Sequence, residues 1–144
     1  MILGSWRIYW NEYSAETYLY GAEVTIHNKE DVEYRNILMP PGTVIKQWFS
    51  ATNYQMQKIE PALPIIDGES KYHIILNIDG VEEAIVRLVF LDRYGQEAGI
   101  TIVRGNEMDF KCPLKTYSYK MQLINGGGSY FRFHYITIQE ITDE

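Results

Sequence analysis

Apolar and polar residues alternate along most of the chain. A period of two is typical of a β-strand with one buried face, because successive side chains point to opposite sides of the sheet. Between these segments lie short runs that favour tight turns, such as Asp79-Gly80 and residues 93–96. In the five clearest segments we expect these apolar rows to face the core: Tyr18, Tyr20, Ala22, Val24 and Ile26; Tyr72, Ile74, Leu76 and Ile78; Val86, Leu88 and Phe90; Ile100 and Ile102; Tyr119, Met121 and Leu123.

The last segment, residues 130–141, changes the phase of its alternation. Phe131, Phe133 and Tyr135 share one face, and the apolar row then continues at Ile136 and Ile138. One extra residue in a strand produces such a change, so we predict a β-bulge near Tyr135. A further strand is expected at residues 43–49, whereas residues 50–59 lack a strand pattern and are expected to form a loop or one helical turn. Together these segments predict an all-β fold, a two-sheet antiparallel sandwich.

Length and charge limit the remaining possibilities. The chain has 144 residues and is 46% hydrophobic, which suffices for one continuous core, so we expect residues 1–144 to form a single β-sandwich domain. The formal net charge is −6, and no cluster of Lys and Arg occurs that would neutralise a run of phosphates. Nucleic acid is therefore not an expected partner.

Cysteine use and hydropathy indicate the compartment. Cys112 is the only cysteine, so no internal disulfide can form. The N-terminal residues lack the charged and apolar regions of a signal peptide. No window approaches ~18 uninterrupted apolar residues, and no basic amphipathic helix is apparent. We expect a cytoplasmic protein without direct membrane insertion, associated with membranes only through partners.

Motifs for catalysis are weak. Tyr54 and Lys58 have the Y-x-x-x-K spacing of short-chain dehydrogenases, but no nucleotide-binding strand, glycine turn and helix accompany them, which favours an ordinary pair of loop residues. Neither G-x-S-x-G nor a local Ser/His grouping occurs. We therefore assign no catalytic residue and no cofactor.

Two groups of side chains have residue types that bind metal ions. His27, His73 and His134 fall on separate predicted strands, where a lone histidine is more often solvated or hydrogen-bonded, so no zinc site is assigned. Glu82, Glu83 and Asp92 offer the hard oxygen ligands of a structural Ca²⁺, although acidic residues at hairpin tips are usually only solvated. The sequence leaves the calcium alternative open.

The aromatic residues are more informative, because 14% of the chain is aromatic. The apolar face of a sugar stacks on Trp or Tyr, while amide and acidic groups bind its hydroxyls. A candidate carbohydrate-binding or partner-binding set lies near the predicted loop: Trp48, Asn53, Tyr54, Gln55 and Gln57. The alternative, equally weighted, is that Trp48 belongs to the core. Trp6 and Trp10 are expected in core or edge packing.

Several segments resemble known proteins. R-L-V-F-L-D-R-Y-G-Q-E (87–97), M-D-F-K-C-P and Y-S-Y-K-M-Q-L-I-N-G-G-G resemble the second half of jelly-roll carbohydrate-binding modules. With E-T-Y-L-Y-G-A (16–22), L-M-P-P-G-T-V-I-K-Q-W-F-S (38–50), Y-Q (54–55) and P-A-L-P (61–64), the order is similar to one family, the third accessory secretory proteins of the bacterial accessory Sec system. The resemblance covers residues 6–138 and implies a jelly-roll sandwich like that of carbohydrate-binding modules.

The resemblance also implies a function. It points to a cytosolic, non-catalytic subunit that joins a glycosyltransferase-like and an O-acetyltransferase-like sister protein and supports modification and export of serine-rich-repeat glycoprotein adhesins. The motor ATPase of the accessory Sec system is a further candidate partner. Two alternatives remain: a free-standing carbohydrate-binding, lectin-like module, and a small sugar-active enzyme. The enzyme needs two carboxylates in one groove, which the spacing of Glu12, Glu16, Asp92 and Glu97 does not establish.

Overall fold

The computed structural model describes residues 2–10, 15–17, 23–35, 42–49, 70–80, 84–103, 105–126 and 130–142. These ranges contain eleven strands: β1 (Ile2–Ile8), β2 (Ala15–Thr17), β3 (Glu23–Asn28), β4 (Asp31–Arg35), β5 (Val44–Phe49), β6 (Lys71–Asp79), β7 (Ala84–Leu91), β8 (Glu97–Val103), β9 (Glu107–Lys111), β10 (Ser118–Asn125) and β11 (Tyr130–Ile141). Within the same ranges, no helix is long and apolar enough to cross a membrane.

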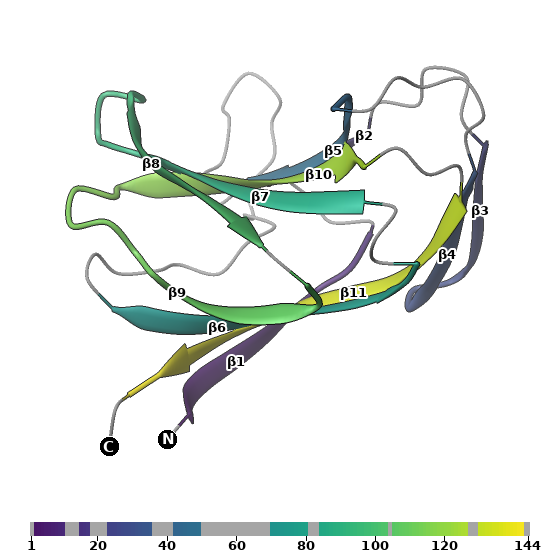
Figure 1. Ribbon diagram of the computed structural model, residues 1–144, viewed down its shortest axis with the longest axis horizontal. Helices are drawn as coiled ribbons and strands as arrows, with labels where there is room; N and C mark the ends of the chain where they lie inside the picture. The colour runs from purple at the N-terminus through teal and green to yellow at the C-terminus, as the bar shows by residue number, and fades with distance from the viewer. Residues whose placement is uncertain are drawn as a thin grey trace.

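The strands form two sheets that pack face to face as two layers (Figure 1). The first sheet has the order β3-β4-β11-β6-β9, and β1 also pairs with β11. The second has the order β2-β5-β10-β7-β8. Every pairing is antiparallel. The predicted all-β fold, a two-sheet antiparallel sandwich, is confirmed.

Strand β11 organises the first sheet. Its first half pairs with β4 over Tyr130–Phe133, and its second half pairs with β1 from Ile136 onward. The register against β6 shifts between Phe133 and Tyr135, which confirms the predicted bulge. Phe131 and Phe133 lie in the core before the shift, and Ile136 and Ile138 lie there after it. Tyr135 itself was expected on the core row but is only half-buried, with the Arg7 guanidinium 4.4 Å from its ring centroid.

Three of the predicted core rows are confirmed. Their side chains are at most 7% exposed and interleave between the sheets: Tyr72, Ile74, Leu76 and Ile78 on β6; Val86, Leu88 and Phe90 on β7; Tyr119, Met121 and Leu123 on β10. The strand expected at residues 43–49 is β5. Trp10 is buried in the core and Trp6 is partly exposed on β1, in agreement with the core or edge packing expected for them.

The prediction for Ile100 and Ile102 was wrong, because they are 47% and 45% exposed. Residues paired across two strands point to the same face, and Phe90 pairs with Gly99. The register also shifts next to this pair, between Phe90 and Leu91. Gly99, Thr101 and Val103 therefore face inward, and the two isoleucines face outward.

The prediction that the row from Tyr18 to Ile26 faces the core was wrong at Ile26. Strand β3 begins at Glu23, Val24 is half-buried against the core, and Ile26 is 51% exposed. Tyr18, Tyr20 and Ala22 lie outside the described residues.

Candidate functional site

Trp48, which the sequence placed either in a binding site or in the core, is fully buried. Its ring stacks on Phe133 of the opposite sheet, with centroids 5.6 Å apart, and its indole Nε1 donates a hydrogen bond to the Tyr9 carbonyl at 2.9 Å. The core alternative therefore agrees with the structure. The remaining members of the proposed binding set lie outside the described residues, and their role stays a prediction: Asn53, Tyr54, Gln55 and Gln57.

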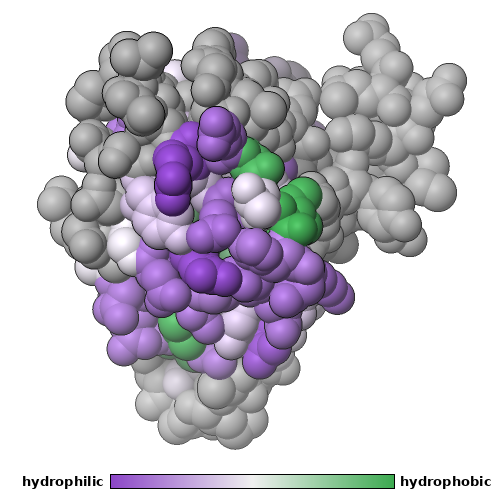
Figure 2. Space-filling view, turned by 90° about the vertical axis from the view of Figure 1, so that its right-hand side faces the viewer, coloured by the Kyte–Doolittle hydropathy of each residue, from purple (hydrophilic) through white to green (hydrophobic). Residues whose placement is uncertain are grey.

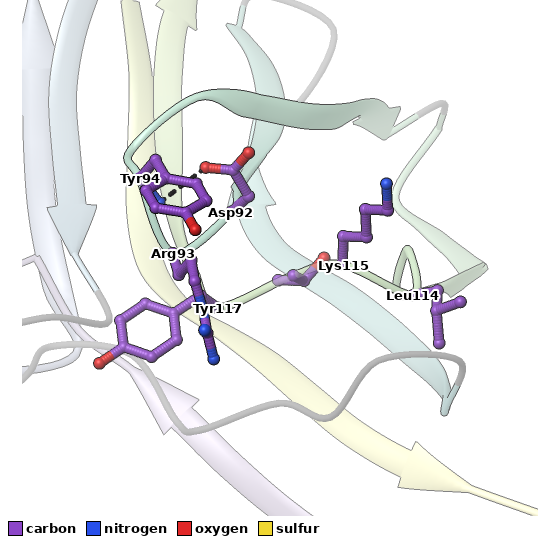
Figure 3. Close-up of a pocket in the computed structure, with 7 residues that line it drawn as sticks. Asp92, Arg93, Tyr94, Leu114, Lys115 and Tyr117 are labelled. Atoms are coloured by element: carbon purple, nitrogen blue, oxygen red, sulfur yellow. Dashed lines mark hydrogen bonds between the residues drawn. The ribbon is translucent and has the colours of Figure 1, made fainter.

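A groove that the sequence did not indicate lies at one end of the sandwich. It forms between the β7–β8 connection (residues 92–96) and the β9–β10 connection (residues 112–117), which lie on the left in Figure 1. Its volume is about 480 Å³. The lining residues come from both connections (Figure 3): Asp92, Arg93, Tyr94, Leu114, Lys115, Thr116 and Tyr117.

Asp92 builds the first wall of this groove. Its Oδ1 accepts hydrogen bonds from the backbone N–H groups of Tyr94 and Gln96, at 2.8 and 3.0 Å. Asp commonly stabilises a turn in this way, and Gly95 supplies the required positive φ of +78°. The resulting hairpin holds Tyr94 outward, with 80% of the side chain exposed.

Backbone hydrogen bonds hold the second wall, and one of them reaches β7 of the second sheet. The Tyr117 N–H donates to the Leu91 carbonyl at 2.8 Å, and the Thr116 N–H donates to the Pro113 carbonyl at 3.2 Å. Tyr117 and Leu114 are 73% and 69% exposed. The Thr116 hydroxyl is buried without a hydrogen-bond partner in this part of the structure. A buried unsatisfied hydroxyl is costly, so a ligand that reached it would gain a hydrogen bond.

The groove has the chemistry of a contact site. Two exposed tyrosine rings offer faces for stacking, and Arg93 and Lys115 offer cationic donors. Asp92 is the one carboxylate among its lining residues, whereas glycoside hydrolysis ordinarily uses two. No Ser, Cys or His lines it. The arrangement suits binding rather than bond cleavage.

The three histidines lie on the outer face of the first sheet, each beside a carboxylate. His27 Nε2 lies 2.5 Å from Glu33, His73 Nδ1 lies 2.5 Å from Asp109, and His134 Nε2 lies 3.0 Å from Asp79. Among the described residues, no group of three or more His, Cys, Asp or Glu side chains is arranged so that it could hold a metal ion. For the calcium alternative, Asp92 is engaged in its turn, and Glu82 and Glu83 lie outside the described residues.

These contacts raise the pKa of two histidines. For His73, the hydrogen bond to Asp109 raises the pKa above its ordinary value and outweighs the effect of burial, with a smaller contribution from Glu107. For His134, burial alone would lower the pKa, but hydrogen bonds to Asp79 and to the Glu30 carbonyl raise it. Opposite charges nearby favour the protonated imidazole.

An ion network occupies the β4 end of the same face. Arg132 donates to both Asp31 oxygens, at 2.6 and 2.5 Å, and these hydrogen bonds lower the pKa of Asp31. Glu33 accepts from the Tyr130 hydroxyl at 2.7 Å and contacts His27, and both contacts lower its pKa. The described surface at this end is mostly hydrophilic (Figure 2).

Comparison with known proteins places the chain in a family. Residues 17–140 match the model of the family described as accessory Sec secretory system ASP3. An accessory Sec system protein of Streptococcus gordonii is 33% identical over 149 residues, which cover 96% of this chain and 94% of the relative.

Two solved structures of related complexes contain chains that are similar to this protein. A chain from the crystal structure of accessory secretory proteins 1, 2 and 3 of Streptococcus pneumoniae has a TM-score of 0.85 and 31% identity, over 94% of this chain and 95% of that chain. A chain from the Gap123 glycosylation-associated protein complex of Streptococcus agalactiae has a TM-score of 0.87 and 33% identity over 96% of this chain. This protein spans 45% of the length of that second chain.

A more distant likeness concerns the fold alone. The carbohydrate-binding module structure BiXyn10A CBM1 has a TM-score of 0.53 at 15% identity over 93% of this chain. The jelly-roll sandwich predicted from the sequence is thus confirmed as similar to that of carbohydrate-binding modules, but such a likeness carries no function by itself. Because the family model matches most of the chain and the S. gordonii relative is similar along nearly its whole length, the chain belongs to the accessory Sec secretory system ASP3 family.

Proposed function

We propose that this protein is a non-catalytic subunit of an accessory Sec complex that binds sister accessory proteins. One observation carries the proposal: the chain matches, with a TM-score of 0.85 and over most of both lengths, a chain from the structure of accessory secretory proteins 1, 2 and 3. The match covers 94% of this chain, so its strands and connections follow the same path as those of that chain.

The partners follow from the family. They are a glycosyltransferase-like and an O-acetyltransferase-like sister protein, and the complex supports modification and export of a serine-rich-repeat glycoprotein adhesin. The accessory Sec motor ATPase is a further partner in this proposal. The protein acts in the cytoplasm as one domain over residues 1–144 and reaches the membrane only through these partners.

Two features of the described residues support a non-catalytic role. The groove at the loop end has one carboxylate and no nucleophile with a base beside it. The histidines are each held by carboxylates on the outer face of the first sheet, and none of them lines the groove. Both arrangements supply contacts and stability rather than an activated group.

Export of the adhesin from the producing cell tests this role. Deletion of the gene should reduce secreted adhesin or alter its modification, and expression of the wild-type chain should restore both. Tyr94→Ala with Tyr117→Ala should restore export as well if the groove is not required for assembly. Normal export and modification in the deletion strain would show that the protein does not serve this system.

A second candidate function is a free-standing carbohydrate-binding module. The exposed rings of Tyr94 and Tyr117 on two walls of one groove favour it. Titration of the isolated protein with N-acetylglucosamine oligosaccharides, followed by NMR, should then perturb both connections. Tyr117→Ala should abolish the perturbation, whereas Ile26→Ala, on the other sheet, should not. An unperturbed spectrum at millimolar sugar would exclude this candidate.

A further inference from the structure

The groove at the end of the sandwich carries two cations that the described structure does not neutralise. Arg93 and Lys115 line its two walls, and neither has a carboxylate partner in the part of the chain that the structure describes. Arg132 on the first sheet, by contrast, is paired with Asp31. In a chain with a formal net charge of −6, a hollow lined by unpaired cations attracts anionic ligands.

The side chains of the groove offer more hydrogen-bond donors than acceptors. The guanidinium of Arg93 and the ammonium of Lys115 each carry several N–H donors and no acceptor. The one carboxylate, on Asp92, already uses Oδ1 to accept from two backbone N–H groups of its own turn. No Asn or Gln lines the groove. The matching ligand is therefore one that mainly accepts hydrogen bonds.

A phosphate group meets this requirement better than a neutral sugar does. Each sugar hydroxyl donates as well as accepts, so a site for a neutral sugar needs acceptors that this groove largely lacks. A phosphate monoester carries a charge of about −1.5 to −2 at neutral pH and three acceptor oxygens. It can accept from a guanidinium fork and from a hydroxyl at the same time. Thr116 lines the groove, and its buried hydroxyl has no partner among the described residues, so it can serve as that donor.

Two tyrosine rings give the groove surfaces for stacking. Tyr94 is 80% exposed on the hairpin between β7 and β8, and Tyr117 is 73% exposed on the other wall. Backbone hydrogen bonds hold both positions, and exposed rings on a fixed backbone can stack on the ring of a ligand. Figure 3 shows Arg93 towards the Tyr117 end of the groove and Lys115 away from it. One end thus combines rings with a guanidinium, and the other end adds positive charge.

We propose that this groove binds a small phosphate monoester that carries a ring, the chemistry shared by nucleoside monophosphates and sugar phosphates. Arg93 binds the phosphate, Tyr117 stacks on the ring, and Lys115 attracts the anion. The volume of about 480 Å³ fits such a ligand, because small-molecule sites usually have about 300 to 1,000 Å³. The assignment does not rest on the proposed assembly with sister proteins.

The test titrates the isotope-labelled full-length chain and follows its backbone amide signals by NMR. Adenosine monophosphate and glucose 6-phosphate are the two probes, and at least one should shift the signals of residues 92–96 and 114–117 at millimolar concentration. Adenosine and glucose, which lack the phosphate, should bind about 10-fold more weakly or worse. Lowering the pH from about 7.5 to about 5 should weaken binding, because the second pKa of a phosphate monoester is about 6. No histidine lines the groove to offset this loss of charge.

Variants locate the site. Arg93→Gln should weaken binding by about 10-fold or more, and Arg93→Lys should restore only part of it, because an ammonium lacks the planar fork. Tyr117→Ala should weaken binding of the ester but not that of inorganic phosphate. The matched control is Arg35→Gln on the first sheet, which removes an exposed arginine 5.3 Å from the Tyr130 ring centroid and should bind as wild type does. Circular dichroism checks that each variant folds.

The two probes also identify the ring. Tighter binding of adenosine monophosphate indicates a flat base, and tighter binding of glucose 6-phosphate indicates a sugar ring; both results support the assignment. Inorganic phosphate that binds as tightly as the esters, or glucuronate that binds as tightly as glucose 6-phosphate, would overturn it. Unshifted signals with both probes, or unchanged binding in Arg93→Gln, would also overturn it. N-acetylglucosamine that shifts these signals when neither ester does would overturn it in favour of the second candidate function. Each of these outcomes leaves the proposed assembly untouched.

Discussion

Trp48 and Phe133 join the two sheets by a stacked ring pair, with centroids 5.6 Å apart and ring planes 20° apart. Trp48 belongs to β5 of the second sheet and Phe133 to β11 of the first. Trp10 packs edge-on against the same Phe133 ring at 5.5 Å. Aromatic pairs of this kind stabilise a core beyond the area they bury, so this cluster is central to the packing of the sandwich.

Trp48→Ala should destabilise the protein by about 3 to 5 kcal/mol, because it removes a fully buried indole and leaves a cavity. Trp48→Phe should cost less, since a ring remains to stack on Phe133. Urea unfolding followed by circular dichroism measures both. A loss below ~1 kcal/mol for Trp48→Ala would mean that this side chain is not part of the core, and its binding role would become the better explanation.

Phe90 and Ile100 provide a matched test of which face of the second sheet is buried. Phe90 is fully buried on β7, and Ile100 is 47% exposed on β8. Phe90→Ala should cost about 3 to 5 kcal/mol, whereas Ile100→Ala should change the free energy of unfolding by about 0.5 kcal/mol or less. Equal costs at the two positions would contradict the register in which Phe90 pairs with Gly99.

The position of β8 shows why its face was assigned wrongly from sequence. Alternation defines two faces but not which one is buried, and β8 has Ile100 and Ile102 on one face against Gly99, Thr101 and Val103 on the other. The bulkier residues indicated the wrong face. The bulge in β11 was predictable because the apolar row itself changes phase there. Its place between the partners β4 and β1 follows only from the pairing.

The groove was missed for a related reason. Tyr94 and Tyr117 are distant in sequence, and they approach because β7 pairs with β10, where Leu91 lies opposite Ser118. An aromatic residue inside the turn formed by residues 93–96 was the available signal, since a turn cannot bury it. Trp48 illustrates the converse, because it lies inside strand β5, before the loop begins, and a tryptophan on a strand is readily buried.

Stability should depend on pH through the histidines on the first sheet. The pKa values of His73 and His134 are raised above 6.5, so their stabilisation is complete below pH 6.5 and is lost as the pH rises through the folded-state values. The difference in unfolding free energy between wild type and the double variant His73→Gln, His134→Gln should therefore shrink as the pH rises from about 6 to about 8. A constant difference would contradict the histidine–carboxylate contacts.

Asp31 and Glu33 give the opposite dependence on the acid side. Their pKa values are lowered from 3.8 and 4.5, so their stabilisation is present above those values and is lost as the pH falls through the lower folded-state values. Asp31→Asn should thus reduce the loss of stability in acid, while Glu97→Gln, on β8 of the second sheet and outside this network, serves as the control. Acid unfolding monitored by circular dichroism provides the measurement. Identical acid transitions in wild type and Asp31→Asn would show that the pair with Arg132 contributes nothing.

Assembly is the central claim, and size-exclusion chromatography with light scattering tests it most directly. The purified wild-type chain is mixed with the two purified sister accessory proteins from the same organism, and the mass of each peak is determined. We predict that the chain leaves its own elution position and co-elutes with at least one sister protein at the summed mass. Elution of the chain at its own mass, with both sister proteins unchanged, would contradict its role as a complex subunit.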